Sequence, residues 1–419
     1  MGTIRKENVR AAGGFFATGM MLGLTSLLVL LAGTGCATGG GDAGTMVVEN
    51  LPDGYVRVTH QRLPSTILNA DTLAAWDLWA DGNDYMFNRI AGVCGSDDHF
   101  LLMDGGNAQV VEVDLQGRPV RHFGRRGEGP GEFNFPYYLA VAGGKVWVSD
   151  PGNQRLSVFD RSGAYERDYR LEQYMWFLDG FVPLQDGRIL SALQRNGDFE
   201  SPDAVTMYHT LVLDLTDGSS DTLLTMESLP SQRIEIAAET GQGMVFFGPP
   251  RFAPELHWAR APDGRIWTAS AEDYLLEARD LDGTLLLQIA APSPDLTVTE
   301  RERRWFFEEE GLAFGFGSGE RFQATRASLE KYPFAERRQA VGGLNVDPFG
   351  RIWVEAATAD PGAHRLDLFA PDGSYLGNLG AMPMPAAFTA GGDALLRVED
   401  EDGIEQFYVI AVPEQGEGA

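Results

Sequence analysis

The stretch FGRRGEGPGEFNFPYYLAVAGGKVWVSDPGNQRLSVFDRSG, residues 123–163, combines a glycine-rich run with three short apolar runs and two tight-turn signals. A phosphate-binding loop needs a helix start directly after its glycines, so that backbone N–H groups converge on the anion. Here Gly124–Gly131 is followed by Pro136 and a strand pattern, and the Gly-Lys-Ser/Thr of a P-loop is missing. We therefore interpret the glycines as the joint between two copies of a repeated β unit.

The same strand pattern recurs along the chain after turns rich in Gly or Asp. The second strand of each unit reads HFLLMD at 99, KVWVSD at 145, RILSAL at 188, RIWTAS at 265, RIWVEA at 351 and DALLRV at 393. In four of them Val or Ile alternates with Trp or Leu, so both faces are apolar, as in a strand buried on both sides. Six units of four short strands predict an all-β fold, a six-bladed β-propeller.

The last unit ends after three strands, at QFYVIAV, residues 406–412. The chain start supplies a further strand pattern in GYVRVTH, residues 54–60. We predict that this N-terminal strand completes the last blade and closes the ring, because an open edge would template association. The predicted propeller therefore spans 54–412, with insertions at about 223–254 and 291–340 and a polar tail at 413–419.

Residues 123–163 resemble an NHL repeat, in which a glycine-rich joint runs into a Pro, a strand, an Asp-x-Gly-Asn-x-Arg loop and a Phe-Asp strand end. The other five units match this pattern loosely. Over roughly residues 54–412 the chain resembles bacterial six-bladed β-propeller lipoproteins of the NHL-repeat type. Most members of that group have no assigned activity.

The first 36 residues read as a targeting segment. Three basic residues within the first ten precede an uncharged apolar run, residues 15–31. With small residues ahead of Cys36, this resembles a bacterial lipoprotein signal, in which Cys36 is lipidated and becomes the mature N-terminus. An uncleaved anchor helix and an ordinary secretory signal are the alternatives. Residues 37–53 would then be a flexible tether, and the protein would lie in the cell envelope, lipid-anchored and extracytoplasmic.

The formal net charge of −27 argues against nucleic acid or anionic lipid as a partner through bulk electrostatics. We expect contact with the membrane through the N-terminal lipid, an envelope protein, peptide or glycan as ligand, and a monomer. If Cys36 is lipidated, Cys94 has no disulfide partner and is interpreted as a small buried hydrophobe. A Cys36–Cys94 disulfide is the alternative.

One end of the predicted ring carries all the long loops. The turns after the first and third strands of each unit are uniformly short, whereas the connections after the second and fourth strands vary in length. Loops on a rigid scaffold concentrate binding groups, so we predict that this decorated face is functional; insertion by drift is the alternative. The candidate ligand-binding residues are Arg125 and Arg126 from the glycine joint, with Trp305, Phe306 and Phe314 from the large insertion.

The large insertion has a helical pattern. TVTERERRWFFEEEG opens with a capping-box pattern, Thr297 to Glu300, and stops at Gly311, which predicts a short helix. A second helix-like run reaches Pro333, and GFGSG lies between the two as a hinge. The many aromatic residues of this segment either pack it onto the propeller or line a lid over the mouth of the central channel.

Patterns for catalysis are poor. None of the six histidines has a metal-ligand spacing, and no G-x-S-x-G elbow occurs. His257 is the only histidine on a predicted inner strand, where it either faces the channel or is a hydrogen-bonded core residue. No catalytic residue, metal ligand or cofactor is predicted. We favour a non-enzymatic binding module; the alternative is a metal-dependent propeller hydrolase or lyase, gluconolactonase-like or amidating-lyase-like, with its site in the channel.

Overall fold

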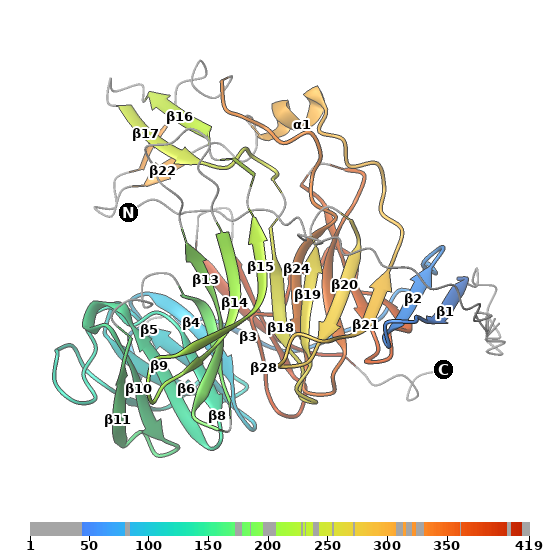
Figure 1. The fold of residues 1–419 in the computed structure, drawn as a ribbon. Coiled ribbons are helices and arrows are strands. Elements are labelled where there is room, and N and C mark those ends of the chain that lie inside the picture. Colours follow the sequence, from blue (N-terminus) through green and yellow to red (C-terminus); the bar gives the residue numbers. More distant parts are fainter. Residues whose placement is uncertain are drawn as a thin grey trace.

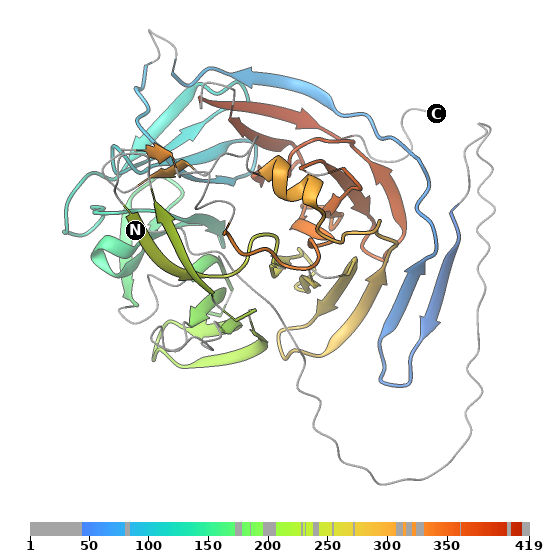
Figure 2. The same ribbon diagram turned by 90° about the horizontal axis from the view of Figure 1, so that it is seen from above.

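The computed structural model is a ring of six antiparallel β-blades (Figures 1 and 2). It describes residues 44–79, 84–171, 178–184, 186–195, 207–227, 229–230, 232–237, 243–253, 255–270, 273–306, 313–315, 321–323, 331–360, 362–399 and 404–412. The predicted all-β, six-bladed propeller is confirmed. In the described part of the chain, no helix is long and apolar enough to cross a membrane.

The first three blades follow one another along the chain, each ordered from inner to outer strand. Blade 1 contains β4 (Ile90–Gly95), β5 (Phe100–Asp104), β6 (Gln109–Val113) and β7 (Pro119–Phe123). Blade 2 contains β8 (Leu139–Ala142), β9 (Lys145–Asp150), β10 (Arg155–Asp160) and β11 (Tyr165–Arg170). Blade 3 contains β12 (Leu178–Pro183), β13 (Arg188–Arg195), β14 (Met207–Asp214) and β15 (Ser220–Glu227).

Blades 4 and 5 each consist of four consecutive strands, whereas blade 6 takes its outer strand from the N-terminal segment. Blade 4 contains β18 (His257–Arg260), β19 (Ile266–Ser270), β20 (Leu275–Arg279) and β21 (Leu285–Ala290). Blade 5 contains β24 (Val341–Val346), β25 (Ile352–Ala357), β26 (His364–Phe369) and β27 (Tyr375–Asn378). Blade 6 contains β28 (Ala387–Phe388), β29 (Ala394–Glu399), β30 (Glu405–Ala411) and the N-terminal strand β3 (Asp71–Trp76).

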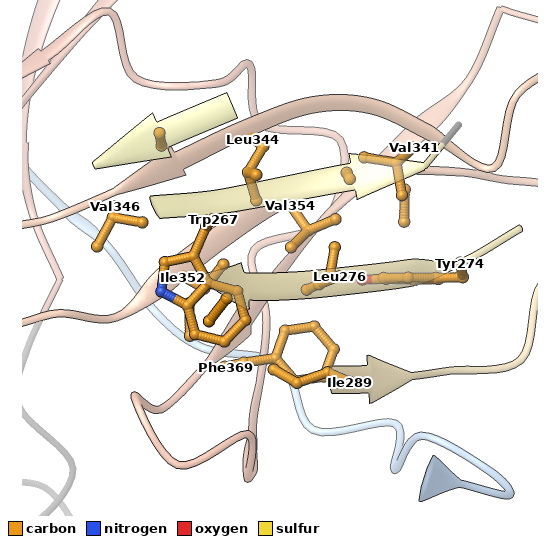
Figure 3. Packing of buried hydrophobic residues seen from close by; sticks show 14 of the residues in the cluster. Trp267, Tyr274, Leu276, Ile289, Val341, Leu344, Val346, Ile352, Val354 and Phe369 are labelled. Atoms are coloured by element: carbon orange, nitrogen blue, oxygen red, sulfur yellow. The ribbon is translucent and has the colours of Figure 1, made fainter. Parts of the chain in front are cut away.

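The core lies between neighbouring blades. Every residue of β5 is buried, and Trp267 and Trp353 in the corresponding strands of blades 4 and 5 are fully buried. Figure 3 shows Trp267, Leu276 and Ile289 of blade 4 facing residues of blade 5, including Val354 and Phe369. The apolar character of both faces of these strands is therefore explained by their position between two blades.

The ring is closed by a different N-terminal strand from the one predicted. β3 pairs antiparallel with β30 and completes blade 6, whereas β2 (Val56–His60) pairs parallel with β21. β2 also forms a hairpin with β1 (Met46–Asn50), which extends blade 4 to six strands. The assignment of GYVRVTH to the last blade was wrong, because both segments have strand character and only the path of the chain around the ring decides which one reaches β30.

The N-terminal segment from β1 to β3 forms a belt around three blades. Between β2 and β3 the chain passes the outer strand of blade 5, where Leu68 N donates to Asn378 O at 2.8 Å and Asn378 N donates to Thr66 O at 2.9 Å. Figure 2 shows this blue segment along the outside of blades 4, 5 and 6. The belt, residues 46–76, therefore covers three outer edges that would otherwise offer open hydrogen-bonding groups.

His60 holds the belt to blade 5 and should make its docking sensitive to pH. The imidazole is buried, its Nε2 lies 2.8 Å from Gly373 O, and the rings of Phe369 and Tyr375 lie beside it. Burial lowers the pKa of His60 below its usual 6.5, against a smaller opposing effect of the hydrogen bond to Gly373. Below about pH 6.5 the unfolded chain therefore binds a proton that the folded chain excludes, and stability falls.

We expect the free energy of unfolding in urea to decline between about pH 7.5 and pH 5.5, and His60→Gln to flatten that decline. Glutamine retains a hydrogen-bond donor but does not titrate. An equal decline in the parent and the variant would contradict the assignment to His60.

The large insertion differs from its prediction in detail. The helix α1 spans Glu300–Trp305, and its capping box joins Thr299 and Glu302 instead of Thr297 and Glu300. Thr297 instead hydrogen-bonds to the carboxylate of Asp295. Phe306 caps the helix, which therefore ends before Gly311, a residue outside the described part.

Two short hairpins complete the described insertions. A hairpin of β16 (Gln232–Ala237) and β17 (Gly243–Gly248) follows blade 3, and β22 (Ala313–Gly315) pairs with β23 (Arg321–Gln323). Most of the second predicted helix, residues 324–330, lies outside the described part, as do residues 316–319 of the predicted hinge.

Candidate functional site

The two ends of the ring differ in the way that the loop lengths predict. At one end, short turns begin with an aspartate whose carboxylate accepts N–H bonds from the residues two and four positions later. In the first of these turns, Gln116 N and Arg118 N donate to Asp114 Oδ1 at 2.9 and 3.0 Å, and Gly117 takes a φ of 78°, which favours glycine. The same carboxylate bonds recur at Asp160, Asp280 and Asp347.

The other end is the decorated face. Figure 1 shows α1, the β16–β17 hairpin and β22 above this end of the ring. Because the strands of a blade alternate in direction, the connections after the second and fourth strands all reach this end. Those connections include the glycine joint, residues 124–138, which leads from β7 to β8.

A buried aspartate at the end of β5 holds the segment that enters blade 1. Asp104 is fully buried, and its carboxylate accepts N–H bonds from Asn88 at 2.9 Å and Arg89 at 3.2 Å. It also accepts bonds from the backbone of Gly106 and Asn107. The loop after β5 and the approach to β4 are therefore fixed to one another at the decorated face.

Asp150 does the same in blade 2. It is fully buried at the end of β9 and accepts N–H bonds from Asn134 at 2.9 Å and Phe135 at 2.8 Å. Asn153 Nδ2 donates to the same carboxylate at 2.7 Å. The Asp and Asn of the NHL-like loop thus position the residues directly ahead of the inner strand β8.

The two anchored segments present an aromatic surface to solvent. Phe135 and Tyr137 are each 39% exposed, and their rings are nearly parallel, at 11° with centroids 6.3 Å apart. Arg89 Cζ lies 5.6 Å from the Phe135 ring centroid. This distance is within the range of a cation–π contact.

A second guanidinium lies at the same place. Arg126 Nη2 donates to Gly106 O at 2.8 Å, and Arg126 Nη1 donates to Asn134 O at 3.4 Å. Arg89 approaches the neighbouring glycine closely, since a Cβ on Gly105 would lie 2.8 Å from Arg89 Nη2. Arg89, Arg126, Phe135 and Tyr137 therefore form one exposed group, which we call the rim cluster.

The sequence identified one member of the rim cluster and missed three. Arg126 belongs to it, whereas the exposed Arg125 pairs with Glu132 through Nη2 to Oε1 at 2.6 Å. The Gly129 N–H bond and then Arg125 hold the pKa of Glu132 below its usual range. The signal for the missed residues is the run FNFPYY, which places aromatic side chains in a loop immediately before an inner strand.

The insertion residues lie elsewhere. Phe306 is 1% exposed and packs against Phe252, Tyr332 and Phe334, with Arg251 Cζ 4.8 Å from its ring centroid. Trp305 is half-buried and approaches Gly362 so closely that a Cβ there would lie 2.2 Å from the indole. The contacts of Phe306 are those of a packed core, and the ligand-binding roles of Phe306 and Trp305 remain predictions.

Three further positions were singled out in the sequence, namely Phe314, Cys36 and His257. Phe314 lies in β22, and its side chain is outside the described part, as is Cys36. His257 is half-buried at the start of β18, the inner strand of blade 4, as predicted. Among the described residues, no group of three or more His, Cys, Asp or Glu side chains is placed to hold a metal ion.

The fold defines the protein as a six-bladed β-propeller, and short sequence matches relate part of it to NHL repeats. No family model matches the chain. Sixty residues, 14% of the chain, are 42% identical to NHL repeat-containing protein 3 of Mus musculus. Sixty-two residues, 15% of the chain, are 39% identical to RING finger protein nhl-1 of Caenorhabditis elegans. The chain spans only 17% and 6% of the lengths of these relatives.

Three solved structures show similarity over most of the chain. A protein described as exported, from Bacteroides fragilis, is 10% identical with a TM-score of 0.46, covering 84% of this chain and 96% of that one. A member of the duf4221 family from Bacteroides vulgatus is 9% identical with a TM-score of 0.49, covering 83% and 99%. A streptogramin B lyase is 12% identical with a TM-score of 0.38, covering 82% and 97%.

Proposed function

We propose that the protein is a membrane-tethered, extracytoplasmic β-propeller that binds an envelope protein, peptide or glycan through its decorated face. The observation that carries this proposal is the difference between the two ends of the ring. One end carries only short turns, several of them aspartate-glycine turns, and the other carries the glycine joint, α1 and two hairpins. A rigid ring with variable loops at one end is a common arrangement for ligand binding.

The decorated face also has the rigidity that binding favours. The buried carboxylates of Asp104 and Asp150 hold the backbone on both sides of the rim cluster. A loop whose backbone is already fixed in this way loses less conformational entropy when a ligand binds.

The proposed anchor is compatible with a ring that stands away from the bilayer. Met46, the first residue of β1, lies ten positions after Cys36, because 46 − 36 = 10. A chain of that length reaches at most about 35 Å. Because β1 lies on the outer edge of blade 4, the tether would leave the ring from its side, and the decorated face would remain accessible.

Two cysteines make the anchor testable by counting thiols. Burial raises the pKa of the Cys94 thiol to about 12, so we expect it to react slowly with thiol reagents in the folded protein at pH 8. If Cys36 carries lipid, the full chain purified in detergent should show no fast-reacting thiol when folded and one thiol when denatured. Two thiols after denaturation would contradict lipidation.

Cys36→Ser is the matched variant for the same prediction. It should release the protein from membranes and abolish labelling with a fatty-acid analogue, because a chain of net charge −27 has little electrostatic attraction to anionic lipid. Cys94→Ser, which leaves the proposed anchor intact, should fractionate and label like the parent. If Cys36→Ser still fractionated with the membrane, the proposed lipid anchor at Cys36 would be wrong.

A further inference from the structure

We propose that the rim cluster is a binding site for an acidic glycan, a chain of sugar rings that carry carboxylates. The inference rests on the proposed function, since it names the ligand class of the same decorated face. It uses the four exposed side chains of Arg89, Arg126, Phe135 and Tyr137 and the backbone that positions them.

The aromatic pair provides the apolar half of the site. Isolated exposed aromatic residues are common at protein surfaces, but Phe135 and Tyr137 are two nearly parallel rings on one anchored segment. Phe135 N donates to the buried Asp150, and Tyr137 N donates to Ser149 O at 3.0 Å. The C–H faces of a sugar ring are apolar, so a fixed pair of flat rings can bury them without leaving polar groups unsatisfied.

The arginines provide the charged half. A guanidinium has five N–H donors, and Arg126 donates two hydrogen bonds to the backbone carbonyls of Gly106 and Asn134. Within the described residues, neither Arg89 nor Arg126 forms an ion pair with a carboxylate, unlike their neighbour Arg125. In a chain of net charge −27, two exposed guanidinium groups beside the same Gly105–Gly106 turn are a local positive site for a carboxylate.

The combination favours a glycan over other anions. Duplex nucleic acid carries about one charge per 1.7 Å, a much denser charge than one carboxylate per sugar ring, so the bulk negative charge of the protein repels it more strongly than an acidic glycan. A small aromatic acid is usually enclosed on most of its surface, whereas Arg89, Arg126, Phe135 and Tyr137 are all exposed. An extended chain of acidic sugars can lie across such an open surface, place one ring on the aromatic pair and direct its carboxylate to the arginines.

The test uses the full chain in detergent and an oligogalacturonate, with a neutral galactose oligosaccharide of equal length as the comparison. We expect calorimetric titration to show binding of the acidic chain, weakening as salt is raised, and far weaker binding of the neutral one. Arg89→Ala and Arg126→Ala should each raise the Kd about 10-fold, the loss of one charge-assisted contact. Tyr137→Ala should raise it a few-fold, whereas Tyr137→Phe, which retains the ring, should bind like the parent.

Arg167→Ala is the matched control, because Arg167 is an exposed arginine on β11 at the outer edge of blade 2. It should leave the Kd unchanged, and thermal melting should show that all variants are folded. Equal binding of the neutral oligosaccharide, no binding of the acidic one, or wild-type affinity in both arginine variants would overturn the proposal. A peptide or neutral glycan that binds elsewhere on the decorated face would overturn this ligand class and leave the proposed function standing.

Discussion

Replacing Trp76 by alanine should lower the free energy of unfolding by about 3–5 kcal/mol, the usual cost of truncating a large buried aromatic residue. Trp76 is 3% exposed at the end of β3. Its ring stacks on Phe407 of blade 6 at a centroid distance of 6.0 Å and meets Phe100 of blade 1 at 5.7 Å. Its Nε1 donates to Leu115 O at 3.0 Å.

The effect should be large because these contacts join the last blade to the first. Each other blade boundary lies between segments that follow one another in the chain, but this one depends on an N-terminal strand that returns to β30. The packing is tight, since a Cβ on Gly117 would lie 2.5 Å from the Trp76 ring. Removing the indole therefore leaves a cavity at the seam of the ring and takes the hydrogen-bond donor from the half-buried carbonyl of Leu115.

Leu73 is the matched control on the same strand, because its side chain is 48% exposed. Leu73→Ala should change the free energy of unfolding by about 0.5 kcal/mol or less. Urea unfolding followed by tryptophan fluorescence and by circular dichroism measures both variants. A Trp76→Ala protein as stable as Leu73→Ala would show that β3 does not hold the ring closed.

The sequence was sufficient to predict the number of blades but not to predict which strand closes the ring. Residues such as Trp267 and Trp353 alternate with Ile in copies of one pattern, and that local pattern is dictated by burial between two blades. GYVRVTH also has strand alternation, yet it pairs with β21 because the chain enters the ring at blade 4. Which edge a strand finds is decided by contacts far apart in sequence, and periodicity carries no information on them.

The candidate site was only partly predictable from the sequence, again because it depends on contacts between residues that are far apart in the chain. Loop lengths placed the decorated face, and the glycine joint pointed to Arg126. Arg89 lies 37 residues earlier in the chain, since 126 − 89 = 37, and joins the cluster only because Asp104 folds its loop back onto the approach to β4. Arg89 was missed, whereas Phe306 was a candidate because it is an aromatic residue in a long insertion. In the structure it packs among other aromatic residues.

Replacing Arg338 by alanine should destabilise the α1 segment by about 3 kcal/mol, because it leaves a buried carboxylate without its counter-charge. The side chains of Arg338 and Glu302 form an ion pair in which they are 10% and 4% exposed. Arg338 Nη2 also donates to Thr358 O at 2.9 Å, beyond the end of β25 in blade 5. The pair therefore fastens α1 to the propeller beside the aromatic core around Phe306.

Arg301→Ala is the matched control on the same helix. Arg301 pairs with Asp360 at 3.6 Å, but both side chains are about three-quarters exposed, at 76% and 75%. An exposed pair of this kind contributes about 0–1 kcal/mol, so its loss should have little effect. Hydrogen exchange of the α1 amides, together with thermal melting, separates local from global destabilisation.

The result also distinguishes the two interpretations of the insertion. If α1 is packed permanently on the propeller, Arg338→Ala should accelerate exchange in α1 and around Phe306 far more than Arg301→Ala does. The double variant Glu302→Gln/Arg338→Met should recover part of the loss, since it removes the buried charge together with its partner. Fast exchange of the α1 amides already in the parent, unchanged by Arg338→Ala, would instead indicate a segment that opens readily and would favour the lid.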